Sequence, residues 1–168
     1  MLATCCRTSN PARWRTPCSG FWRTSNPATN EDDLERETYN ELCGYTLTHP
    51  DPAFIHQYVV DAYGAQRAAD DTRSIRLAFA LVGLYLYVEK KYSGRNVQRV
   101  HTLLAQRRKQ WPTFHLPTSR GDITVRDVMS AAPGPERDEM IQKWCASVWE
   151  AYRASHDDVV RLVRAELG

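Results

Sequence analysis

The sequence predicts an all-α protein, a helical bundle of four main helices with one or two short ones, preceded by a disordered N-terminal arm. Apolar residues recur at helical spacing through most of the chain after residue 51. No run of alternating β-branched residues indicates a sheet. The first 38 residues are polar, basic and rich in turn-forming steps. We therefore expect a disordered basic and polar arm over residues 1–38 and a helical bundle domain over residues 39–168.

The predicted arm contains a short internal repeat. The hexapeptide from Arg7 to Ala12 recurs from Arg23 to Ala28. Two polar copies cannot form a stacked repeat, which needs at least three units, and the Asn-Pro step in each copy opposes helix. The arm is either a dispensable, translated upstream stretch or a targeting or binding arm rich in Arg and Ser/Thr. The acidic run from Glu31 to Glu37 can start a short helix after it.

The first two main helices are expected on either side of residue 70. Asp51 is a suitable N-cap and Pro52 suits the first helical position, so a helix should start there and end near residues 66–69. The second helix should cover about residues 72–92, where Gly94 helps to stop it. It is apolar almost all round, which is typical of a helix at the centre of a bundle.

The rest of the chain predicts two further main helices. The third should cover about residues 96–109, followed by a long loop over residues 110–122 that contains two prolines and a glycine. A short helix is expected over residues 124–131. The last main helix should begin after a Pro-Gly-Pro step and continue without a break to about residue 166.

Length and composition limit the class of protein. A chain of 168 residues with 42% hydrophobic and 25% charged residues can bury one substantial core. Residues 1–30 carry four arginines and no acid, which leaves 18 basic against 20 acidic residues in the remainder. This balance does not favour a nucleic-acid partner for the bundle. The longest uncharged apolar run has twelve residues, whereas a transmembrane helix needs about 20, so no membrane association is expected.

The cysteines and the N-terminus indicate a location. The five cysteines form no CxxC pair and no regular disulfide pattern, which is typical of a reducing compartment. Residues 1–30 contain no apolar segment of the kind found in secretory signals. We therefore expect a cytoplasmic protein.

Four polar residues interrupt the apolar faces of the first and last main helices. His56 and Asp61 border the apolar stripe of the first, and Gln66 lies within it. His156 lies one turn beyond Tyr152 on the apolar seam of the last helix. Such residues usually find partners inside a core, and Gln66 could cap the end of its helix. The alternative is that the four form a polar site between these helices.

A helical bundle can also hold a metal ion between facing helices. His56, His156 and Glu89 are the candidate ligands, although Glu89 could equally mark the solvent end of its helix. No HExxH pair, glycine-rich phosphate loop or nucleophile elbow is present. The favoured hypothesis is a small-molecule binding or interaction module. The alternative is a metal-dependent enzyme, and no cofactor, ligand or catalytic residue can be named from these residues.

Exposed aromatic residues provide a further hypothesis. Tyr45, Trp111 and Phe114 lie in or near expected loops, where large rings are often available to a partner. A homodimer formed through these rings is therefore expected as one alternative.

Several stretches resemble a known family. They are Cys43-Gly44, His49-Pro50, the segment from Phe54 to Gln66, Trp111-Pro112, the segment from Ile123 to Val128, and the segment from Trp144 to Tyr152 followed by His156. Together they are similar to a bacterial family of unknown function, DUF5946, over roughly Leu42 to Val163. The resemblance excludes the arm.

The resemblance implies a helical bacterial protein and supplies no activity. Members often carry a histidine directly after the glutamine that aligns with Gln66, whereas this chain has Arg67 there. Any role of that histidine is therefore absent. The resemblance is consistent with His56, Asp61, Gln66 and His156 as a polar set.

Overall fold

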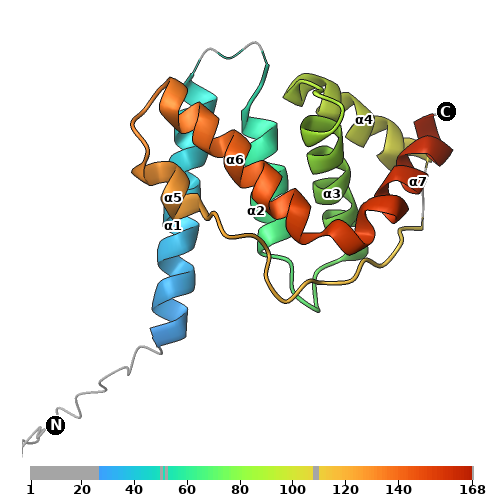
Figure 1. The fold of residues 1–168 in the computed structure, drawn as a ribbon, viewed down its shortest axis with the longest axis horizontal. Helices are drawn as coiled ribbons and strands as arrows, with labels where there is room; N and C mark the ends of the chain where they lie inside the picture. Colours follow the sequence, from blue (N-terminus) through green and yellow to red (C-terminus); the bar gives the residue numbers. More distant parts are fainter. Residues whose placement is uncertain (1–26, 50, 52, 108–109, 168) are drawn as a thin grey trace, which may run out of the picture.

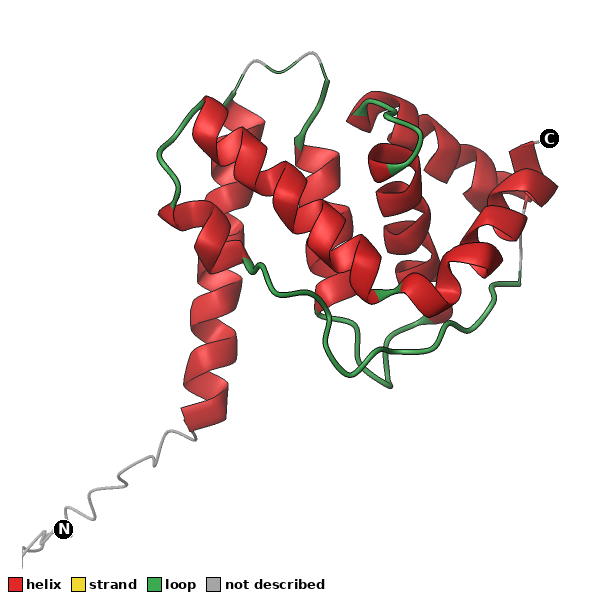
Figure 2. Ribbon diagram, viewed as in Figure 1, coloured by secondary structure: helices red, strands yellow, loops and turns green. Residues whose placement is uncertain are grey.

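A computed structural model describes residues 27–49, 51, 53–107 and 110–167, and all regular structure within them is helical (Figures 1 and 2). The predicted all-α class is confirmed, whereas residues 1–26 of the arm expected over residues 1–38 lie outside the described residues. In chain order the elements are α1 (Pro27–Thr48), α2 (His56–Gln66), α3 (Ser74–Val88), α4 (Gly94–Arg107), α5 (Val125–Ser130), α6 (Pro135–Ala151), the 3-10 turn η1 (Arg153–Ser155) and α7 (His156–Leu167).

The central helix of the bundle is α3, as its apolar sequence predicts. Its residues from Leu77 to Leu86 are buried, except Phe79, which is partly buried. The helix contacts α2, α4, α6 and α7, and α2 also packs against α1, α4 and α6. Burial of this one helix on nearly every side gives the domain a single continuous core.

The first difference from the sequence analysis concerns residues 27–38, which were expected in the arm. They form the first half of α1, a helix of 22 residues that extends beyond the rest of the bundle in Figure 1. Arg67 at the end of α2 forms ion pairs with Asp32 and Glu35, and Arg126 on α5 pairs with Glu31. Two cations from distant parts of the chain thus hold the acidic run in place. Such long-range ion pairs cannot be predicted from the periodicity of the sequence.

A second difference lies at the start of α2, which begins at His56 and not at Asp51. The Asp51 carboxylate does accept backbone hydrogen bonds, from the amides of Ala53 (2.8 Å) and Ile55. It therefore caps a turn that precedes the helix. In this turn Phe54 has a φ of +59°, a left-handed conformation that cannot continue an α-helix.

A third difference is that the last expected helix is broken in two. The backbone leaves the α conformation at Tyr152, passes through η1 and resumes as α7. The Tyr152 hydroxyl donates to the Ala65 carbonyl (2.8 Å), and Val159 and Leu162 of α7 are buried on the core. The bend lets α7 turn back onto α3. The described residues accordingly contain six longer helices and one short one, where four main helices and one or two short ones were expected.

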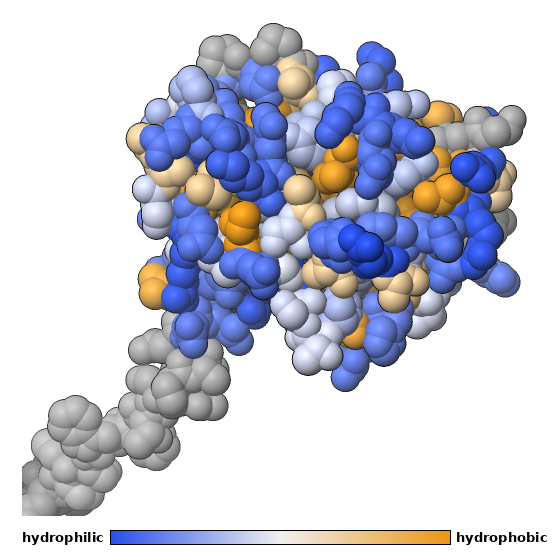
Figure 3. All heavy atoms as spheres, viewed as in Figure 1, coloured by the Kyte–Doolittle hydropathy of each residue, from blue (hydrophilic) through white to orange (hydrophobic). Residues whose placement is uncertain are grey.

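The surface of the bundle is largely polar. In the view of Figure 3, hydrophilic residues cover most of the face, and apolar residues appear as small separate areas. Within the part of the chain that the structure describes, no helix combines the length and apolar character needed to cross a membrane.

Candidate functional site

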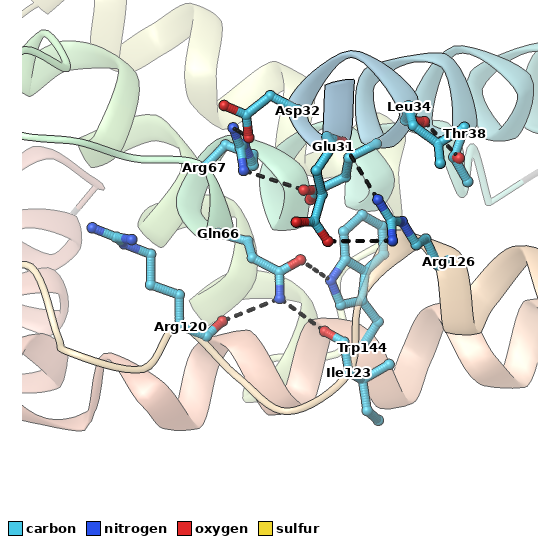
Figure 4. A network of polar contacts seen from close by, with 11 residues as sticks. Glu31, Asp32, Leu34, Thr38, Gln66, Arg67, Arg120, Ile123, Arg126 and Trp144 are labelled. Carbon is cyan, nitrogen blue, oxygen red and sulfur yellow. Dashed lines mark hydrogen bonds and ion pairs between the residues drawn. The ribbon is translucent and has the colours of Figure 1, made fainter. Parts of the chain in front are cut away.

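Gln66 is fully engaged in hydrogen bonds that hold the fold together. Its side-chain oxygen accepts from the indole nitrogen of Trp144 (2.9 Å), and its amide nitrogen donates to the carbonyls of Ile123 (2.8 Å) and Arg120 (3.3 Å). Figure 4 shows this amide between α2, α6 and the loop before α5. Gln66 therefore fastens the loop to the core instead of capping its own helix.

His156 and Glu89 are joined through Trp149 on α6. The His156 ring stacks on the Trp149 indole with centroids 3.7 Å apart, and its Nε2 lies 2.8 Å from the Trp149 carbonyl oxygen. The Trp149 indole nitrogen donates to Glu89 (3.0 Å). Both candidate metal ligands thus have partners: His156 secures the junction between α6 and α7, and Glu89 joins the end of α3 to α6.

His56 links α1 to α2. Its Nδ1 lies 2.9 Å from the Thr46 hydroxyl, and its ring makes an edge contact with Phe54. Burial lowers the pKa of His56, because the charged imidazolium loses hydration. This environment favours a neutral histidine that joins two helices.

The four residues proposed as one polar site therefore lie in separate surroundings. Gln66, His156 and His56 each bond to other residues, and the contacts described above join none of them to Asp61. Among the described residues, no group of three or more His, Cys, Asp or Glu side chains is placed to hold a metal ion. Of these four residues, only Asp61 has a fully buried side-chain atom without a hydrogen-bond partner.

Asp61 is a carboxyl group in the centre of the bundle. It is only 4% exposed, and its Oδ1 accepts a hydrogen bond from Gln57 one turn earlier on α2 (3.0 Å). Its Oδ2 is fully buried and has no partner. Burial raises the pKa of Asp61 well above its ordinary value of 3.8, against the opposing effect of the Gln57 bond. The group is therefore held as an uncharged acid well above pH 3.8.

Gly83 on α3 makes room for this carboxyl. A β-carbon at position 83 would lie 1.9 Å from Asp61 Oδ2 and 2.5 Å from its Cγ. No other residue type fits at position 83 while Asp61 keeps its present position. The only glycine within the apolar α3 is thus explained by the acid on α2.

His101 on α4 is the second group with unused capacity. Its ring stacks on Phe79 of α3 with centroids 4.9 Å apart, and its Nε2 is buried without a partner. Burial lowers the pKa of His101 to about 4, and a hydrogen bond to the Phe79 backbone acts in the opposite direction. At neutral pH the imidazole is therefore uncharged.

Asp61 and His101 line the same pocket between α1, α2, α3 and α4. Its volume is about 320 Å³, and its wall combines aromatic rings with a few polar groups. The lining residues are Tyr39, Gln57, Val60, Asp61, Tyr63, Gly64, Arg76, Phe79, Ala80 and His101. Of three buried side-chain atoms without a partner in the described part of the chain, two belong to Asp61 and His101 and the third is Arg120 Nε. The pocket lined by Asp61 and His101 is therefore the candidate site.

Tyr39 and Tyr63 form one wall of this pocket. Their rings stack with centroids 3.8 Å apart and an interplanar angle of 9°. Burial raises the pKa of both phenols, and a bond between the side chains of Tyr39 and Cys43 adds to the shift for Tyr39. Neither phenol ionises near neutral pH, so Arg76 is the one charged residue along the lining. Arg76 is exposed and lies at the open side.

The rings expected to support a homodimer are packed within the chain. Phe114 is 5% exposed, Trp111 makes an edge contact with Phe79, and the Tyr45 hydroxyl accepts from the Gly134 amide (2.8 Å). The dimer itself stays a prediction, but these rings do not supply the exposed surface on which it was based.

Sequence reasoning identified Asp61 and missed Gln57, Gly83 and His101 as its neighbours. The spacing of Gln57 and Asp61 by four residues was a usable signal, because such positions meet on a helix face. A lone glycine inside an apolar helix was another. The position of His101 in the pocket depends on how α3 and α4 pack against each other, and no local sequence pattern predicts that packing.

The fold and the pocket define a class, a small all-helical domain with a buried uncharged polar site. The family of unknown function DUF5946 matches the chain over residues 36–153, so the chain belongs to that family. The match includes Asp61, Gly83 and His101 and ends before His156. Comparison with curated proteins and with solved structures finds no match.

Proposed function

We propose that this chain is a binding module that takes a small molecule into the pocket lined by Asp61 and His101. The observation that carries the proposal is that one pocket is lined by both Asp61 and His101, each of which has a buried polar atom without a partner. A buried polar group without a hydrogen bond costs about 1–3 kcal/mol. A ligand that bonds to both groups would recover much of that cost, so the pocket has a physical reason to be occupied.

The size and lining of the pocket support the same function. A volume of about 320 Å³ lies at the lower end of the range for ligand sites, roughly 300–1,000 Å³. Such sites combine mostly apolar walls with a few polar groups that orient the ligand. Here Phe79, Tyr39 and Tyr63 provide the walls, and Asp61 and His101 provide the polar groups.

Not every hollow among the described residues has this feature. One of about 370 Å³, between the start of α3 and residues 113–116, contains Asp70, Thr72 and His115. Within the described residues, none of its lining side chains has a buried polar atom without a partner. It therefore offers no comparable reason to bind a ligand.

The test uses a variant that fills the pocket. A β-carbon at Gly64 would meet only Ala80 Cβ, at 3.6 Å, so a side chain fits locally and Gly64→Leu would extend into the space that both residues line. Gly44→Leu is the matched control, because a β-carbon there has nothing within 4 Å. Both changes replace a helical glycine with a better helix former.

Four probes are titrated by ¹H–¹⁵N NMR: benzene, phenol, 2-pyridone and N-methylacetamide. We expect at least one probe to shift the backbone amides of Ala80 and Gly83 in the wild type and in Gly44→Leu, and not in Gly64→Leu. No saturable shift with any probe, or equal shifts in Gly64→Leu, would refute the proposed function.

A further inference from the structure

We infer that the pocket selects a neutral planar ring that carries both a hydrogen-bond acceptor, for Asp61, and a hydrogen-bond donor, for His101. This inference rests on the proposed function and specifies its ligand. Asp61 and His101 come from different helices and line one space with aromatic walls, and each carries a buried polar atom without a partner. Each has a definite hydrogen-bonding role, which follows from its existing contacts.

Asp61 is the donor. Its Oδ1 already accepts from Gln57, so the proton of the uncharged acid belongs on Oδ2, the oxygen without a partner. Oδ2 occupies the space that a side chain at position 83 would fill, so no side chain at that position accepts its hydrogen bond. The O–H of Asp61 therefore needs an acceptor that the chain does not provide.

His101 is the acceptor. Its hydrogen bond to the Phe79 backbone raises the pKa, as expected when the ring donates to a carbonyl. Because Nε2 has no partner, the donating nitrogen is Nδ1, and Nε2 carries the lone pair in the neutral ring. A ligand must therefore donate to His101.

The walls favour a flat and uncharged ligand. The stacked pair Tyr39 and Tyr63 lies on one part of the lining, and Phe79, stacked on His101, lies on another. Aromatic faces such as these favour planar rings. A ligand charge at the inner end would be buried without a counter-ion, because Arg76 lies at the exposed side.

The experiment compares ligands that differ by one group. The first probe is 2-pyridone, which has both a carbonyl acceptor and an N–H donor. N-methyl-2-pyridone lacks the donor, and benzene lacks both groups. The fourth probe, benzoate, is charged. We expect 2-pyridone to bind the wild type about tenfold more tightly than N-methyl-2-pyridone, the usual effect of one neutral hydrogen bond. Benzoate should bind least.

Two variants assign the preference to the proposed residues. His101→Phe keeps a ring against Phe79 and removes the acceptor, so the preference for 2-pyridone over its N-methyl derivative should disappear. Asp61→Asn keeps a donor beside Gln57 and should bind 2-pyridone as the wild type does. The spectra report in the same samples whether each variant is folded.

The outcomes separate the two claims. If benzene and both pyridones bind the pocket equally, the binding function stands and the inference about its ligand is refuted. If benzoate binds most tightly, or His101→Phe keeps the tenfold preference, the inference is likewise refuted. If no probe binds in any variant, the proposed function fails, and the inference fails with it.

Discussion

Replacing Gly83 by alanine should destabilise the protein, although the same change is favourable in most helices. An alanine is better than glycine inside a helix by about 0.5–1 kcal/mol. Here the new methyl group would overlap Asp61 Oδ2, 1.9 Å away, so the carboxyl must move. Overpacking costs about 1–3 kcal/mol, and loss of the Gln57 bond adds about 1 kcal/mol. We therefore expect a net loss of about 2 kcal/mol.

A double-mutant cycle shows whether Asp61 is the cause. In an Asp61→Ala background the two shortest contacts disappear, and the remaining one joins β-carbons 3.2 Å apart. Gly83→Ala should then be close to neutral, which gives a coupling energy of about 2 kcal/mol between the two positions. Equilibrium urea unfolding, followed by tryptophan fluorescence, measures all four proteins.

Gly44→Ala is the control for helix propensity. Its β-carbon would meet nothing within 4 Å, so this change should stabilise the protein by about 0.5–1 kcal/mol. If Gly83→Ala stabilised the wild type as much as Gly44→Ala does, the packing of Asp61 against α3 described above would be refuted.

Three further predictions follow from groups around the pocket and the core. His101 has a pKa of about 4 when folded and 6.5 ordinarily, so the unfolded chain binds more protons between these values and stability falls as pH falls. Measured by urea unfolding as pH falls through this window, the wild type should lose about 3 kcal/mol relative to His101→Phe, in which the contributions of the other groups are the same, and equal pH dependence of the two proteins would contradict the burial of His101. Gln66→Leu should cost about 2–4 kcal/mol in the same assay, because it leaves the indole nitrogen of Trp144 and two carbonyls without partners; a neutral effect would exclude this role. Arg67→Ala should change global stability by less than about 1 kcal/mol, since its ion pairs are partly exposed. Hydrogen exchange in the first half of α1 should nevertheless become faster, and unchanged exchange would show that the ion pairs do not hold this segment.

The sequence was sufficient for the fold class and for the centre of the core. The apolar stretch from Leu77 to Leu86 has no polar face, so it could only be a helix surrounded by others. The break at Tyr152 was not visible, because the apolar seam continues in register through His156. It is fixed by tertiary contacts, the bond from Tyr152 to Ala65 and the stacking of His156 on Trp149.

Local reasoning allowed a short helix from Glu31 to Glu37, but it did not predict the continuous helix of 22 residues that α1 forms. A polar segment with many charges has little apolar surface to bury, so composition favours disorder. The structure shows that Arg67 and Arg126, far along the chain, form ion pairs with three of its acids, Glu31, Asp32 and Glu35. Figure 4 shows these two cations on one side of the helix.

The candidate site could be predicted only in part. Asp61 was recognised as an unusual polar residue on an apolar helix, but it was grouped with residues on its own helix and on the last one. The actual neighbours, Gly83 and His101, are carried by α3 and α4. Which polar residues share a pocket depends on the angles and rotations at which helices pack, and these are long-range properties.

The central claim is that the pocket around Asp61 is uncharged, and the ionisation of this one carboxyl tests it most directly. The polar groups around the acid are Gln57 on α2, Tyr39 on α1, Cys145 on α6 and His101 on α4, and Cys43 lies beside Tyr39. Burial raises the pKa of both thiols and of the phenol, and lowers that of the imidazole, so all are neutral near pH 7. The exposed Arg76 is the one cation along the lining.

The measurement is a ¹³C NMR titration of the Asp61 side-chain carboxyl, assigned by comparison with Asp61→Asn. A raised pKa means that the folded state binds the extra proton, so this stabilising contribution is present below pH 3.8 and is lost as pH rises towards the folded pKa. We predict that the Asp61 signal stays that of a protonated acid well above pH 3.8. A titration centred near pH 3.8 would show an ordinary ionised carboxylate and would contradict the account.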